Sequence, residues 1–151
     1  MANPKSEHNQ PLADPTAHFK SIPWCAKLLS ARNIVGVLVP DRTPIPSTES
    51  SFIRETLNTP STVNACVTFL KYVKPTKESI EAGETKEKPF LEMVALLELG
   101  GGVNGYVGTA HGGFNGVVLD EVLGTVANMQ SGKFTRSHFT ISLEGGFRGV
   151  S

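Results

Sequence analysis

Residues 111–130 read HGGFNGVVLDEVLGTVANMQ, and this stretch decides the fold class of the chain. Four of its positions are spaced four residues apart and line one face of an α-helix: Gly112, Gly116, Asp120 and Gly124. Most of the other positions are apolar, chiefly valine and leucine, so the helix is apolar around most of its circumference. The pattern therefore predicts a helix over 112–130 that a β-sheet encloses.

Strand patterns flank this helix on both sides. The segment from Val63 to Leu70 alternates in the manner of a strand, and a second apolar run covers 90–99. The connection over 74–89 is dense in Lys and Glu, which indicates a solvated loop. These features predict a hairpin with a long charged loop, and the alternation over 136–144 predicts a third strand after the helix.

The first part of the chain differs in composition. Residues 1–20 are polar with three prolines, which predicts a disordered lead without regular structure. Residues 21–61 combine a short helix over 23–31 with a proline-rich segment that wraps the domain, in which 52–57 favours a brief helix. Residues 62–151 form the main domain, and the order of elements predicts the α+β class.

Charge and composition exclude several classes of protein. The 151 residues carry 14 Lys plus Arg and 14 Asp plus Glu, so no net charge favours nucleic-acid binding. The chain has no secretory signal and no apolar run of the ~20 residues that a membrane span needs, so we expect a cytoplasmic or mitochondrial protein. Cys25 and Cys66 lack metal-ligand spacing and are expected to fill the core, with no metal and no cofactor.

The aspartate on the glycine face is the first candidate for chemistry. A carboxylate in a buried helix is costly unless it is paired, protonated, or reached by water and substrate. Glu121 faces about 100° away from Asp120 around the helix, so only one of the two shares the glycine face. Alignment with the glycines favours Asp120 as the functional carboxylate; the alternative is that Asp120 simply points to the surface.

The start of the helix is the second candidate. The backbone N–H groups of His111, Gly112 and Gly113 are expected to be unpaired donors, where the helix dipole adds about half a positive charge. Such donors suit the oxygen of a polarised carbonyl. Asp120 lies about 12 Å further along by helical rise. Two copies of the helix, paired antiparallel in a homodimer, are therefore needed to bring both groups to one carbonyl.

The run NGYVGTAHGG at residues 104–113, followed by Leu119-Asp120-Glu121, resembles a known family. It is similar to the His-Gly-Gly motif and downstream aspartate of hotdog-fold thioesterases, namely the PaaI-like and THEM-type enzymes and especially their fungal members. The resemblance covers roughly residues 62–144. It implies a hotdog fold, with an antiparallel sheet wrapped around a long central helix. It also implies homodimers or dimers of dimers, and hydrolysis of acyl-CoA in lipid metabolism without a metal.

The resemblance also implies roles for individual residues. The Gly112 amide polarises the thioester carbonyl, His111 shapes the entry to the site, and Asp120 is the base or nucleophile contributed across the dimer interface. Further substrate contacts are implied for Asn104, Tyr106, Gly108, Gly113 and Glu121. Tyr106 also suits a core or interface position.

The sequence departs from the family in two places. Many members carry an asparagine six residues before the histidine, whereas this chain has Gly105 there and Asn104 one position earlier. The family's sheet continues for two or more strands after the one that resembles residues 136–144. We therefore expect a hotdog domain that is truncated at its C-terminus.

The sequence also suggests three functions other than hydrolysis. Truncation favours a non-catalytic or inactive acyl-binding module. His111 with Asp120 also suits a hotdog dehydratase or hydratase, in which the imidazole removes a proton next to the thioester carbonyl. Gly100, Gly102 and Gly105 match a dinucleotide-binding glycine pattern. A β-like segment follows where that motif needs a helix, which disfavours dinucleotide binding.

Overall fold

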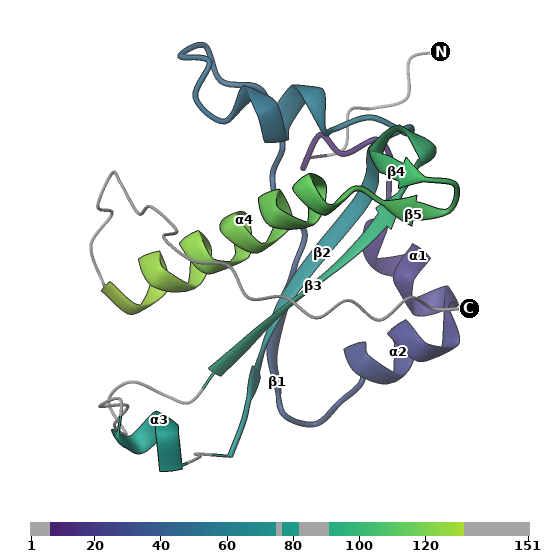
Figure 1. Cartoon of the computed structure of the whole chain (residues 1–151). Helices are drawn as coiled ribbons and strands as arrows, with labels where there is room; N and C mark the ends of the chain where they lie inside the picture. The colour runs from purple at the N-terminus through teal and green to yellow at the C-terminus, as the bar shows by residue number, and fades with distance from the viewer. Residues whose placement is uncertain (1–6, 75–76, 82–90, 132–151) are drawn as a thin grey trace. The chain divides into compact units, whose positions relative to one another are not determined.

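The computed structural model describes residues 7–74, 77–81 and 91–131 (Figure 1). Along these ranges the elements are α1 (Pro15–Ser21), α2 (Pro23–Leu29), β1 (Ile34–Leu38), a π-helical turn (Phe52–Thr56), β2 (Val63–Tyr72), α3 (Lys77–Glu81), β3 (Leu91–Leu99), a 3-10 turn (Gly101–Val103), β4 (Asn104–Tyr106), β5 (Thr109–Ala110) and α4 (Gly112–Ser131). The predicted α+β class is confirmed. The chain forms two compact units, Met1–Gly100 and Gly101–Ser151.

The first unit is built on a three-stranded antiparallel sheet with the order β1-β2-β3. Val67 lies opposite Leu96 in the pairing of β2 with β3, and Val37 lies opposite Phe69 in the pairing of β1 with β2. The two predicted strands of the hairpin are confirmed as β2 and β3. Alternation identified β2, which buries nearly every second side chain along its length, and an apolar run identified β3.

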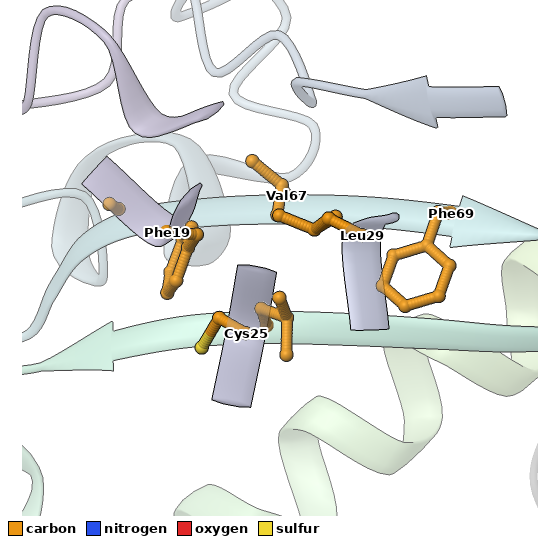
Figure 2. Close-up of a cluster of buried hydrophobic side chains, with 7 residues drawn as sticks. Phe19, Cys25, Leu29, Val67 and Phe69 are labelled. Atoms are coloured by element: carbon orange, nitrogen blue, oxygen red, sulfur yellow. The ribbon is translucent and has the colours of Figure 1, made fainter. Parts of the chain in front are cut away.

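The hydrophobic core lies between the two N-terminal helices and the sheet, as Figure 2 shows. It consists of Phe19, Cys25, Leu29, Ala65, Val67, Phe69 and Leu96. Val67 and Phe69 are among the largest fully buried side chains of the described residues. Both cysteines are buried and unpaired, as predicted for core residues.

The N-terminal segment is more ordered than its composition predicts. Pro15 begins α1, and the Asp14 carboxylate caps this helix by accepting the Ala17 N–H at 2.9 Å. Phe19 then enters the core. The prediction of a disordered lead is therefore wrong for residues 15–20, because burial of Phe19 against the sheet offsets the cost of ordering a polar segment.

Gln10 gives a second reason for this order. Its side-chain amide accepts the Cys66 N–H at 2.7 Å and donates to the Cys66 carbonyl at 3.0 Å. The amide thus pairs with β2 in the way a neighbouring strand would, just beyond the end of β1. Because these contacts join residues 56 positions apart, no local sequence pattern predicts them.

The proline-rich segment contributes a strand that the sequence pattern does not predict. Ile34–Leu38 forms β1 at the edge of the sheet, with an irregular register between Ile34 and Gly36. The brief helix expected over 52–57 is present as a single π-helical turn at Phe52–Thr56. The predicted helix over 23–31 is confirmed as α2, and the charged connection after β2 contains α3.

The second unit places the β4–β5 hairpin directly before α4 (Figure 1). The predicted helix over 112–130 is confirmed almost to the residue, since α4 spans Gly112–Ser131. The sheet and α4 belong to different units, and wrapping of the one around the other is not shown. The predicted strand over 136–144 lies outside the described residues. None of the described helices has the length and apolarity to cross a membrane.

Candidate active site

The histidine of the predicted motif forms the N-cap of α4. Its Nδ1 atom accepts the Gly113 N–H at 2.9 Å, which is the hydrogen bond that a capping side chain makes at the first turn. Because Nδ1 is an acceptor, the neutral imidazole carries its hydrogen on Nε2. The His111 ring is exposed, and its role at this position is to fix the start of the helix.

The cap changes the number of N–H groups available at the helix start. The His111 N–H donates to the Val103 carbonyl at 2.8 Å, and the Gly113 N–H donates to the imidazole. The expectation of three unpaired donors is therefore wrong for His111 and Gly113. Gly112 alone of the three lacks an acceptor among the described residues, because the first helical residue has no carbonyl four positions back.

The hairpin before α4 holds His111 from the other side. Gly105 lies so close that a Cβ built on it would be 3.1 Å from His111 Cα and 3.2 Å from the ring atom Cδ2. A larger residue would push the capping histidine away from Gly113. The roles of Gly105 and of the Val103 carbonyl were not predicted from the sequence. The glycine at position 105, where the resemblance implies an asparagine, was the one signal that could have pointed to them.

The close approach gives a physical reason for a glycine at position 105. A Cβ there would make a tight contact with the backbone of His111, so the capped arrangement favours glycine. Asn104 pairs with Ala110 in the hairpin, and its amide nitrogen lies 3.7 Å from the Cβ position of Gly101. Its predicted contact with substrate remains a prediction.

The tip of the hairpin is strongly exposed. Tyr106 is 84% exposed and Val107 is 101% exposed. Gly108 adopts a φ of 71°, a conformation that the tight turn between β4 and β5 requires and that glycine adopts without strain. Tyr106 is therefore not a core residue of this chain, and a substrate or interface role is the part of its prediction that stays open.

The two carboxylates lie halfway along α4, and both are exposed. The expectation that Asp120 is buried is wrong for the single chain, in keeping with the tendency of helical carboxylates to stay hydrated. Asp120 follows Gly112 by eight residues, or about 12 Å of helical rise, so one chain does not bring the two groups together. Glu121 points to a neighbouring face of the helix.

The glycine face of α4 is defined as Gly112, Gly116, Asp120 and Gly124, and open space is found at two of its positions, Gly112 and Gly124. No described atom lies within 4 Å of a Cβ built on Gly112 or on Gly124. Each interior helical glycine costs roughly 0.5 to 1 kcal/mol relative to alanine. Open glycines at helical spacing are therefore costly to a single chain and suit a second helix that packs against them.

The described residues contain no group of three or more His, Cys, Asp and Glu side chains arranged to hold a metal ion. No protein-family model, curated protein or solved structure matches this chain. The resemblance to hotdog thioesterases over roughly residues 62–144 therefore remains a prediction.

Proposed function

We propose that this protein hydrolyses acyl-CoA thioesters at a site shared by two copies of the chain. The observation that carries the proposal is the Gly112 N–H. It points from the start of a 20-residue helix without an acceptor in the described residues. It also lies on the open face that Asp120 shares. An unpaired amide at a helix start and a carboxylate are the two groups that this hydrolysis requires.

The chemistry follows from these two groups. The thioester carbonyl oxygen accepts the Gly112 N–H, and the helix dipole stabilises the negative charge that develops on it. Asp120 acts as the general base, taking a proton from water as the hydroxide attacks the carbonyl carbon. The carbon–sulfur bond then breaks, and the coenzyme A thiolate takes up a proton. In the alternative mechanism, Asp120 acts as the nucleophile: it attacks the carbonyl carbon and displaces the thiolate, and water then hydrolyses the resulting anhydride.

Two copies are required because the groups are too far apart on one helix. In an antiparallel pair of α4 helices, Asp120 of one copy lies beside Gly112 of the other. Gly116 is midway between them and lies at the centre of the pair, facing its own counterpart. Glycine is the residue that permits the closest approach at such a crossing. The proposed assembly is a homodimer or a dimer of dimers.

The cap weighs against a dehydratase. A base that removes a carbon-bound proton needs a ring nitrogen with a free lone pair. In His111 the Nδ1 lone pair accepts the Gly113 N–H, and in the neutral ring Nε2 carries the hydrogen. His111 is therefore better suited to hold the helix start than to act as a base, which favours hydrolysis.

A thiol-release assay on short, aromatic and long acyl-CoA esters tests the proposal. Asp120→Asn is expected to lower turnover by a factor of about 100 or more, the range of general-base contributions. Glu49→Gln is the matched control, because it removes an exposed carboxylate of the first unit that the proposed site does not use, and it is expected to retain most of the activity. An equal loss in both variants would contradict the assignment. Acyl-CoA binding without turnover in the wild type would favour the non-catalytic module.

A further inference from the structure

Arg42 is a buried cation in the first unit. Its side chain is only 7% exposed, and its Nη1 atom is buried without a hydrogen-bond partner in the structure. The backbone on which it stands is held firmly. The Arg42 N–H donates to the His8 carbonyl at 2.9 Å, and the Arg42 carbonyl accepts from the Asn9 side chain at 3.2 Å. The backbone of Arg42 is thus anchored, and the residue lies in the interior.

Arg42 interacts with the Cys66 thiol through its charge and a side-chain hydrogen bond. Burial raises the pKa of Cys66, and the charge and hydrogen bond of Arg42 lower it by less. The thiol therefore keeps its proton at neutral pH and supplies no negative charge. The backbone of Cys66 is already paired with the Gln10 amide, so it is not available to the guanidinium either.

The acidic residue adjacent in sequence, Asp41, interacts with other residues. The Asp41 carboxylate accepts the N–H and the hydroxyl of Thr43 at 2.8 Å and 2.7 Å, and it lies 3.8 Å from Arg54. Within the described part of the chain, no carboxylate forms an ion pair with Arg42. A buried charge without a compensating charge is among the most costly features a folded protein can contain.

We propose that Arg42 is the receptor for a small oxyanion taken from solvent, of the size of formate or hydrogen carbonate. A water molecule would accept a hydrogen bond from Nη1 but leave the charge of the guanidinium uncompensated. A carboxylate oxygen accepts the hydrogen bond and also compensates the charge. The ligand is expected to be small because Arg42 itself is only 7% exposed. This inference is independent of thioester hydrolysis, since it concerns the first unit alone.

The test is thermal unfolding of the full chain during a titration with sodium formate, at constant ionic strength maintained with the bulkier methanesulfonate. The wild type is expected to show a saturable rise of its unfolding midpoint, because a ligand that binds only the folded state stabilises it. Arg42→Met is expected to abolish the rise. Arg54→Met is the matched control, since Arg54 has Asp41 and the Thr43 carbonyl as partners and should respond like the wild type.

An unchanged midpoint in the wild type would overturn the proposal, as would an Arg42→Met response equal to that of the wild type. Arg42→Met is expected to fold, because apolar replacement of a buried charge is often neutral or stabilising. If it does not fold, saturation-transfer NMR of ¹³C-formate with the wild-type chain decides the question. A saturable signal supports the site, and its absence rejects it.

Discussion

Replacing Gly112 with proline removes the proposed carbonyl-binding amide and nothing else that the structure shows. Proline is favoured at the first helical position, where its missing N–H has no intrahelical role. The described residues leave more than 4 Å of space around a Cβ on Gly112, and its φ is not positive. His111 precedes it as the N-cap, a position whose extended backbone is compatible with a following proline. Gly112→Pro is therefore expected to fold normally and to lose activity.

The activity recovered when this variant is mixed with Asp120→Asn distinguishes a site shared by two chains from a site within one chain. Each variant alone forms dimers in which neither site has both groups. In an equal mixture about half of the dimers are mixed, and one of their two sites then combines an intact Asp120 with an intact Gly112. The mixture is expected to recover about a quarter of the wild-type activity per chain. Groups acting within one chain would recover nothing, because every chain carries a lesion.

The assay is thiol release after co-refolding or subunit exchange, with two affinity tags to confirm that mixed dimers form. Circular dichroism checks that both variants retain the fold. Mixed dimers that remain inactive, although each homodimer is folded, would refute the shared site. Substantial activity of Gly112→Pro alone would show that its amide has no part in the reaction.

Three further outcomes follow from the structure. Gly105→Ala places a Cβ 3.1 Å from His111 Cα and is expected to cost about 1 to 3 kcal/mol in urea unfolding, whereas Gly124→Ala, with nothing described within 4 Å, should gain roughly 0.5 to 1 kcal/mol. Phe69→Ala empties a site that is 2% exposed and is expected to lower the free energy of unfolding by about 3 to 5 kcal/mol; a loss below about 1 kcal/mol would contradict the core assignment. Burial raises the pKa of Cys66 above its unfolded value of 9.0, so the unfolded chain releases this proton first and stability falls as pH rises past that value. Cys66→Ala should flatten this alkaline limb in a pH series of unfolding midpoints.

Local patterns were sufficient for the elements whose side chains repeat at a fixed period. Alternation identified β2, an apolar run identified β3, and four-residue spacing identified α4 and its glycine face. Periodicity succeeds for β2 because this strand buries nearly every second side chain, which constrains the residues along it. The position of His111, Gly112 and Gly113 at the start of the helix also followed from the sequence.

Tertiary structure decided what depends on residues distant in the chain. The Gln10 amide pairs with β2, β1 joins the sheet from a proline-rich segment, and Phe19 enters the core from a polar one. It also decided which amide at the helix start is free, since the acceptor for His111 comes from Val103 and the close contact from Gly105. Sequence determines local periodicity because neighbouring residues share one element. Hydrogen-bond partners and burial are decided only once separate segments meet.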